Sequence, residues 1–217
     1  MRPILAIVLV ACAVAPAAAG SIRGSVKVPP APPSDATFRP YAGRASSLPA
    51  PARPVRGLPG DAVVYVDALP GGARPHAAAT PRLAQRGQSF EPRVVVVAAG
   101  GEVEFPNFDP IYHNVFSVSP SKRFDLGKYP RGQSRTVRFP KAGLVNVFCD
   151  IHSDMAAFIL VTPTAAWARA GADGGFELRD LPAGRYHVRW WHPDFAAGEG
   201  DIVVPAEGAA ILDVVFR

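Results

Sequence analysis

The stretch that decides the fold is Phe148-Cys149-Asp150-Ile151-His152-Ser153-Asp154-Met155. Within it a thiol, an imidazole and a thioether recur at intervals of three residues, at Cys149, His152 and Met155. A second imidazole, His113, lies upstream in Tyr112-His113-Asn114. Two His and one Cys, with a Met as a weak axial ligand, form a set that suits copper, because soft sulfur favours Cu(I) and imidazole suits both oxidation states. The pattern therefore predicts a copper site.

Each of these residues also has an ordinary structural explanation. Free Cys and Met often fill hydrophobic cores, and a single His often makes a structural hydrogen bond. Zinc is the other metal to consider, but structural zinc takes a closed set of Cys and His, and the sequence has no second Cys-x-x-Cys or His-x₃-His pair. The even spacing of three ligand types favours copper.

From about Gln88 to Val161 the sequence resembles the cupredoxins, the group of plastocyanin, pseudoazurin and amicyanin. The resemblance rests on Tyr112-His113-Asn114-Val115 and on Cys149-x₂-His152-x₂-Met155, whose two-residue gaps are similar to those of amicyanin. It implies a Greek-key β-sandwich that holds one copper ion through His113, Cys149, His152 and Met155. It also implies that Asn114 ties the two ligand segments together by hydrogen bonding.

A longer string of residues resembles a narrower group. Glu104 to Pro110, His113 to Ser117 and Lys122 to Gly127 are similar to uncharacterised plastocyanin-like proteins often labelled methylamine-utilisation proteins. That label implies little about the redox chain that such a protein serves.

Composition points to the same fold class. The 217 residues include 24 Pro and 20 Gly, and few segments show helical periodicity, which is typical of an all-β protein with many turns. In the central region, runs such as Arg93 to Val97 and Glu102 to Phe105 predict strands. Val145, Val147 and Cys149 alternate with polar or outward residues, which places Cys149 at the inner end of a strand. Ser121 to Arg131 is expected to be irregular.

The N-terminus has the pattern of an export signal at residues 1–19. Arg2 is its basic part, Ile4 to Val14 its apolar core, and Ala17-Ala18-Ala19 a small-residue cleavage site. The apolar run is too short for a transmembrane span. We therefore expect a periplasmic protein, with lipid anchoring at Cys12 as the alternative. After cleavage, Cys149 is the only Cys, and metal ligation would explain an unpaired thiol in an exported protein.

Segments on both sides of the predicted copper domain (residues 87–162) read as parts of a second sandwich. Asp173 to Phe176 and Leu181 to Tyr186 resemble the carboxypeptidase-regulatory-like, transthyretin-like modules. In those modules a Gly-x-Val strand and an Ala-x-Val-x-Val strand come first. Here both occur upstream, within residues 20–86. We therefore predict that the copper domain is inserted into a sandwich completed by residues 163–217. Leu69 to Arg86, rich in Pro, Gly and Ala, is expected to be a linker. The alternative is that residues 20–86 are a loose arm and residues 163–217 a separate domain.

Charge limits the partners without identifying them. The formal charge of +5 falls to +4 when residues 1–19 are removed, because only Arg2 is lost. Mild basicity is compatible with acidic protein partners or an anionic membrane surface, but more often it reflects only a soluble surface. The sequence has no basic-aromatic nucleic-acid motif and no phosphate-binding Gly loop.

Three functions remain open at this stage. The first is a periplasmic electron carrier that exchanges single electrons with redox partner proteins. The second is a copper-holding or copper-delivering protein, which would be expected to carry further Met/His clusters. The third is a binding module in which copper is structural, for which Trp190-Trp191-His192 is the support. No enzyme is expected, because the fourth coordination position is offered to Met155 and no catalytic motif is present.

Overall fold

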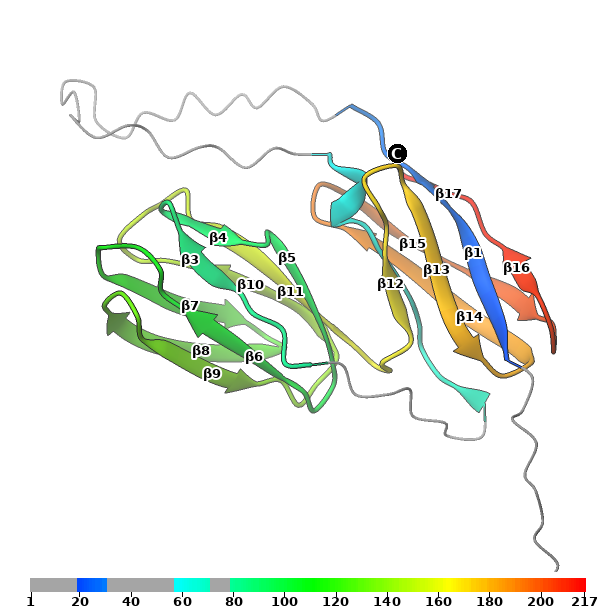
Figure 1. Ribbon diagram of the computed structural model, residues 1–217, viewed down its shortest axis with the longest axis horizontal. Coiled ribbons are helices and arrows are strands. Elements are labelled where there is room, and N and C mark those ends of the chain that lie inside the picture. The colour runs from blue at the N-terminus through cyan, green and yellow to red at the C-terminus, as the bar shows by residue number, and fades with distance from the viewer. Residues whose placement is uncertain (1–18, 31–56, 71–78) are drawn as a thin grey trace, which may run out of the picture.

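The computed structural model describes residues 19–30, 57–70 and 79–217. Apart from one 3₁₀ turn, η1 (Pro59–Asp61), the regular elements of these residues are β-strands. The strands form two β-sandwiches that lie side by side (Figure 1). The predicted all-β fold class is therefore confirmed. Most of the predicted export signal, Cys12 and most of the Pro-rich stretch between the first two strands lie outside the described residues.

The central sandwich comprises β3 to β11. Its larger sheet has the order β5-β11-β10-β7-β8, in which β5 and β11 are parallel and the other neighbours antiparallel. These strands are β5 (Val94–Ala98), β7 (His113–Ser119), β8 (Lys122–Tyr129), β10 (Gly143–Phe148) and β11 (Ala156–Thr162). The facing layer contains two pairs, β3 with β4 and β6 with β9. Their bounds are β3 (Ala84–Arg86), β4 (Ser89–Glu91), β6 (Glu102–Pro106) and β9 (Ser134–Arg138).

Alternating apolar residues build the core of the central sandwich, as a half-buried strand requires. The predicted inward positions Val145, Val147 and Cys149 are buried, as are the alternating residues Val103, Phe105, Val137 and Phe139. Cys149 follows the last residue of β10, so the strand carries it into the core at the end where the loop to β11 begins.

Two segments differ from the prediction. Ser121 to Arg131 contains β8 rather than irregular chain, because Phe124 and Leu126 pack against the core while charged residues alternate with them on the outside. The predicted linker from Leu69 to Arg86 ends in strand β3, and Leu83 beside it is fully buried. High charge concealed the alternation in the first case, and a three-residue strand is too short to show a pattern in the second.

The flanking sandwich is built from strands on both sides of the central one in sequence. Strand β1 (Gly20–Lys27) pairs with β13, β16 and β17, and β2 (Val63–Val66) lies between β12 and β14 in the sheet β12-β2-β14-β15. The remaining strands are β12 (Trp167–Arg169), β13 (Gly175–Leu181), β14 (Gly184–His192), β15 (Phe195–Val204), β16 (Ala209–Ile211) and β17 (Val214–Val215). Strands that precede the central sandwich in the chain thus pair with strands that follow it, as an inserted central sandwich requires.

An apolar layer joins the two sandwiches. Val63 of β2 packs with Val94, Val96 and Leu160 of the central sheet, and all four are buried. Phe158 and Trp191 meet across this junction with ring centroids 5.7 Å apart. The outer face of the β5–β11 half of the central sheet is therefore covered by the flanking sandwich.

Candidate metal centre

Three ligand side chains meet at one end of the central sandwich. His113 is the first residue of β7, Cys149 follows β10, and His152 lies in the loop between β10 and β11. Among the described residues these three form the one group of His, Cys or acidic side chains that could hold a metal, with ligand atoms within 4.8 Å of one another. Cys149 Sγ lies 3.9 Å from Nδ1 of His113 and 3.9 Å from Nδ1 of His152.

These separations fit one shared metal ion. Metal–sulfur and metal–imidazole bonds of about 2.3 and 2.0 Å, about 120° apart in a trigonal set, place sulfur and nitrogen about 3.7 Å from each other. Both His rings turn the same nitrogen, Nδ1, toward the sulfur. The donor set of two imidazoles and a thiol therefore converges as a copper site requires.

Main-chain hydrogen bonds close the loop that follows β10. The amide of Cys149 donates to the carbonyl of Met155 (3.2 Å), and the amide of Met155 donates to the carbonyl of His152 (3.0 Å). Met155 is 1% exposed and packs in the same core cluster as Cys149. The loop thus brings the thioether into the region of the cluster, while its role as a ligand stays a prediction.

The aspartate Asp109 orients His113, and sequence reasoning missed it. Oδ2 of Asp109 lies 2.7 Å from Nε2 of His113, so the ring donates a proton there and leaves Nδ1 to face the sulfur. Asp109 is itself held by the backbone amides of Gly87 and Gln88, at 2.6 and 2.8 Å. An acidic residue four positions before a ligand His was a signal in the sequence, but Asp109 read as an ordinary loop residue there.

Hydrogen bonds to the Cys149 sulfur favour its thiolate form. Burial raises the pKa of this thiol, but its interactions with His113, with the backbone amides of Ile151 and Asn114, and with His152 together lower the pKa to about 6. For His113, burial lowers the pKa, whereas bonds to Cys149 and Asp109 outweigh it and raise the pKa above the ordinary value. The lowered pKa of Cys149 favours the thiolate that metal binding needs, whereas the raised pKa of His113 favours the imidazolium, whose proton a metal ion would displace.

Asn114 contacts the cluster through its main chain. Its backbone amide donates to the Cys149 sulfur, whereas its buried side-chain Oδ1 finds no hydrogen-bond partner among the described residues. The tie between the two ligand segments that the resemblance implies for the Asn114 side chain stays a prediction.

The metal-binding end of the sandwich exposes both apolar side chains and the charged side chains of Asp150 and Asp154. His152 is partly exposed. Four exposed large apolar side chains lie within five residues of a cluster member in the chain: Phe108, Ile111, Tyr112 and Ile151. Phe158 lies away from this end and packs on Trp191 in the junction.

The histidines of the flanking sandwich are not part of the cluster. His187 lies between the carboxylates of Asp201 and Glu199, and His192 is 1% exposed and bonds to the carbonyl of Leu58. His192 is thus too buried to meet a partner or a sugar. His76 lies outside the described residues.

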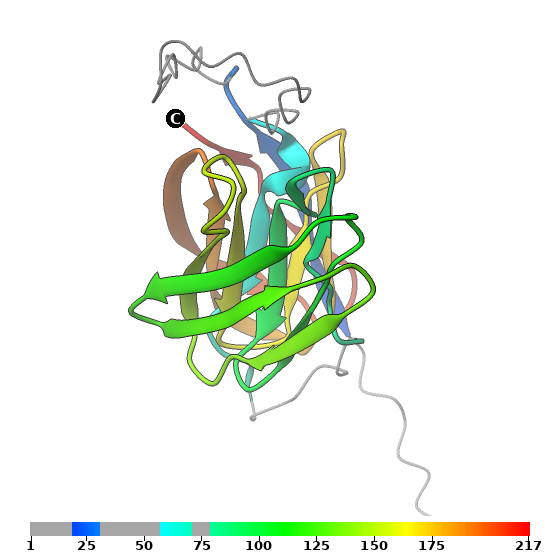
Figure 2. The same cartoon turned by 90° about the vertical axis from the view of Figure 1, so that its left-hand side faces the viewer.

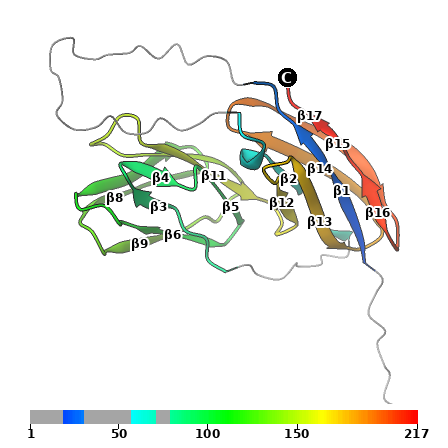
Figure 3. The same ribbon diagram turned by 45° about the horizontal axis from the view of Figure 1, so that its top comes forward.

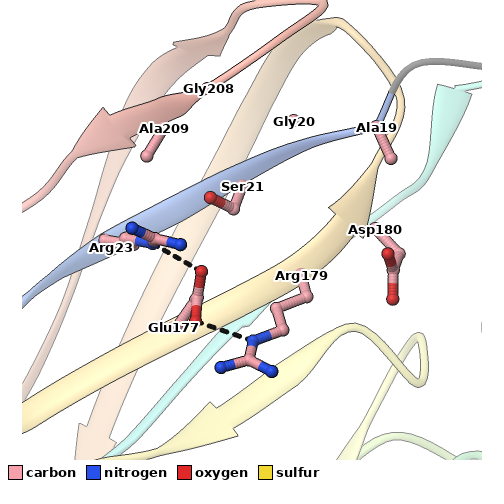
Figure 4. A pocket seen from close by; sticks show the side chains of 9 residues that line it. All are labelled: Ala19, Gly20, Ser21, Arg23, Glu177, Arg179, Asp180, Gly208 and Ala209. Carbon is pink, nitrogen blue, oxygen red and sulfur yellow. Dashed lines mark hydrogen bonds and ion pairs between the residues drawn. The ribbon is translucent and has the colours of Figure 1, made fainter.

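A cavity of about 540 Å³ lies on the flanking sandwich, along β1, β13 and the segment before β16. Figure 4 shows that Arg23 and Arg179 in its wall both bond to Glu177. With Asp180 as the fourth charged residue, the lining has no net charge. Its charged groups are therefore largely occupied by one another.

Comparison with known proteins gives partial structural similarity to cupredoxins. No family model and no curated protein sequence matches the chain. A reduced Cu(I) form of an amicyanin variant matches with a TM-score of 0.36 and 20% identity, over 40% of this chain and 85% of that one. The purple cupredoxin from Nitrosopumilus maritimus matches with a TM-score of 0.32 and 20% identity, over 35% of this chain and 83% of that one.

A third similar structure corrects one expectation. The copper-containing nitrite reductase from Thermus scotoductus SA-01 matches with a TM-score of 0.37 and 27% identity, over 42% of this chain and 24% of that one. The expectation that this chain is not an enzyme, which rested on Met155 and on the lack of a catalytic motif, was wrong, since an enzyme is among the similar structures. The narrower subgroup and the identity of the flanking modules stay predictions. In the described residues no helix has the length and hydropathy that a bilayer crossing needs.

Proposed function

We propose that the protein transfers single electrons through a type 1 copper centre held by His113, Cys149, His152 and Met155. The observation that carries the proposal is the convergence of two Nδ1 atoms on one thiol, each 3.9 Å from the sulfur. Copper bound there would supply the one-electron exchange between Cu(I) and Cu(II).

The protein's own groups hold the ligands in place for this task. Asp109 keeps the proton of His113 on Nε2, and the main-chain bonds of the Cys149–Met155 loop fix the positions of Cys149 and His152. Cys149 and Met155 are buried among core side chains, and close packing limits their movement. A site that changes little between oxidation states needs little reorganisation for each electron transferred.

The partial exposure of His152 supports exchange with another protein. A partly exposed ligand imidazole would give electrons a short path to the surface, and the exposed Ile111, Tyr112 and Ile151 lie near it in the chain. Apolar patches of this kind mark interaction sites. The partner would be a redox protein, and we propose that the exchange takes place in the periplasm, to which the pattern of residues 1–19 would direct the chain.

The decisive experiment is a visible and electron-paramagnetic-resonance spectrum of the purified protein with one equivalent of Cu(II). We expect an intense blue band and a narrow copper hyperfine splitting, which arise from a thiolate–copper bond. The Cys149→Ala variant is the matched control and should lack the band. A colourless wild-type protein, or an ordinary tetragonal copper spectrum, would refute the proposal and favour metal holding or a structural role.

A further inference from the structure

The positive charge of the chain is concentrated in one segment. Residues 121–141 contain seven Lys and Arg but one acidic residue, Asp125, and so carry a net charge of +6, whereas the whole chain carries +5. The rest of the chain therefore sums to −1. We call the seven side chains the basic band: Lys122, Arg123, Lys128, Arg131, Arg135, Arg138 and Lys141.

The basic band lies on β8, on β9 and on the turns that flank β9. These two strands belong to different sheets of the central sandwich, and they run along the side of it that faces away from the flanking sandwich (Figures 1 and 3). Figure 2 views the molecule from that side. Six of the seven side chains are exposed, and Lys122 is partly exposed.

These charges are mostly not neutralised by the protein itself. Within the described part of the chain, Lys128 is the one member of the basic band with an acidic partner, Asp150, at 3.7 Å. By contrast, three arginines of the flanking sandwich each lie within ion-pair distance of a carboxylate: Arg179, Arg185 and Arg189. The band is therefore an extended field of one sign, which attracts a surface of the opposite sign.

One end of the basic band reaches the metal-binding end of the sandwich. Tyr129 of β8 is the pairing partner of His113 in the neighbouring strand β7. The Arg135 guanidinium lies 5.3 Å from the centre of the Tyr129 ring. Lys128 contacts Asp150, which lies between Cys149 and His152 in the chain. A molecule attached to the band would thus extend to the surface where His152 is exposed.

We propose that the basic band is the docking surface for an acidic redox protein, which it holds with the redox centre of that protein toward His152. The inference rests on the proposed electron-transfer function and names the chemistry of its partner. Nucleic acid fits less well, because the aromatic residues of β8, Phe124 and Tyr129, pack inward and offer no ring for base stacking. An anionic membrane would use the same charges but would place no electron acceptor beside His152.

The test compares two triple charge reversals that lower the formal charge equally. Arg123→Glu, Arg131→Glu and Lys141→Glu change the basic band, and Arg179→Glu, Arg185→Glu and Arg217→Glu change exposed arginines of the flanking sandwich as a matched control. The probe is poly-L-glutamate, titrated at low and at high ionic strength. We expect salt-sensitive binding by the wild type, at least tenfold weaker binding by the band variant, and no more than a twofold loss in the control.

Equal weakening in the two variants would overturn the inference, because net charge and not the band would then govern binding. Vesicles of phosphatidylcholine with phosphatidylglycerol are titrated in parallel, and band-dependent binding to them without binding to poly-L-glutamate would also overturn it, in favour of a membrane. The copper spectrum of each variant checks that the site is intact. That spectrum alone decides the proposed function, so failure of the docking surface and failure of the copper site are distinguishable.

Discussion

At the scale of single residues, the hydrogen bond from His113 to Asp109 has the most direct consequence. A carboxylate on the outer nitrogen of a ligand His fixes the tautomer and orientation of the ring, and its loss typically costs 10- to 100-fold in metal affinity. We expect Asp109→Asn, which removes the charge but keeps an acceptor, to weaken Cu(II) binding by about tenfold. The measurement is a chelator competition titration.

Asp125→Asn is the matched control for this variant. Asp125 is an exposed aspartate of β8 whose carboxylate accepts from the amide of Gly127, so its replacement should leave the affinity unchanged. Equal affinities of Asp109→Asn and wild type would show that the contact is structural and does not tune the ligand.

Met155 offers a second prediction at this scale. Leu is close to Met in volume, so Met155→Leu should keep the packing of this buried position. The substitution replaces a weak axial donor with an alkyl group, and the more highly charged Cu(II) loses more from that change than Cu(I) does, so the protein should still bind copper but with a higher reduction potential. Cyclic voltammetry of the two proteins measures the difference. An unchanged potential would mean that the Met155 sulfur does not reach the metal.

The ligands could be predicted from the sequence because their chemistry is rare and their spacing regular. No knowledge of the fold was needed to select Cys149, His152 and His113, since few roles other than metal binding explain a free Cys three residues from a His. Asp109 could not be found in this way, because a loop aspartate has many roles and its partner is fixed by the turn of the chain between β6 and β7. The pairing of Tyr129 with Gln85 and the Phe105 carbonyl was equally hidden.

At the scale of elements, the strands with clean alternation were predictable and those with masked alternation were not. Val103 and Phe105 alternate with acidic residues and face inward as expected. In β8 the inward residues are separated by charged ones and one Gly has a positive φ, at Gly127, so the segment resembled a basic loop. The charges that concealed the strand are the ones that now form the basic band.

The flanking sandwich is best tested at β1, which lies between β13 on one side and β16 with β17 on the other. A Cβ added at Gly24 would meet the Leu212 carbonyl oxygen at 1.7 Å, a distance that forces the main chains apart. We expect Gly24→Ala to destabilise the protein by about 1–3 kcal/mol through overpacking, with the blue copper spectrum kept in the folded state. Thermal unfolding followed by tryptophan fluorescence measures it.

The control for this substitution is Gly60→Ala in η1, where the new Cβ would have only an ordinary contact at 3.8 Å with the Ala170 carbonyl. Its effect should stay within about 0.5 kcal/mol, as for surface substitutions. A Gly24→Ala variant as stable as the wild type would contradict the close pairing of β1 with the segment between β16 and β17.

At the scale of the whole molecule, the junction makes one unit of the two sandwiches. Arg93 of the central sandwich bonds through two nitrogens to Asp194, at 2.8 and 2.6 Å, and also to Asp61 at 3.2 Å. Its guanidinium also lies 5.5 Å from the centre of the Phe158 ring, beside the apolar layer. Both aspartates belong to the flanking sandwich, so the Arg93 side chain connects the central sandwich to the flanking one.

The last prediction concerns this tie and its dependence on pH. Removing one partner of a buried ion pair leaves the other charge uncompensated, at a cost of about 3 kcal/mol, so Arg93→Met should lower the free energy of unfolding by about that amount at pH 7. Burial raises the pKa of Asp194, but the bonds from Arg93 and from the Gly57 amide outweigh it and hold the pKa below 3.8.

A carboxyl group whose pKa is lower in the folded than in the unfolded state stabilises the protein at pH values above its unfolded pKa. That stabilisation is lost as the pH falls through its folded pKa. The difference between wild type and Arg93→Met should therefore shrink as the pH falls below 3.8, in urea unfolding followed by tryptophan fluorescence. The three Trp residues report directly, since all lie in the flanking sandwich. Arg185→Met, whose exposed partner Asp201 is 4.0 Å away, is the control, and a pH-independent difference would mean that Asp194 is not stabilised by Arg93.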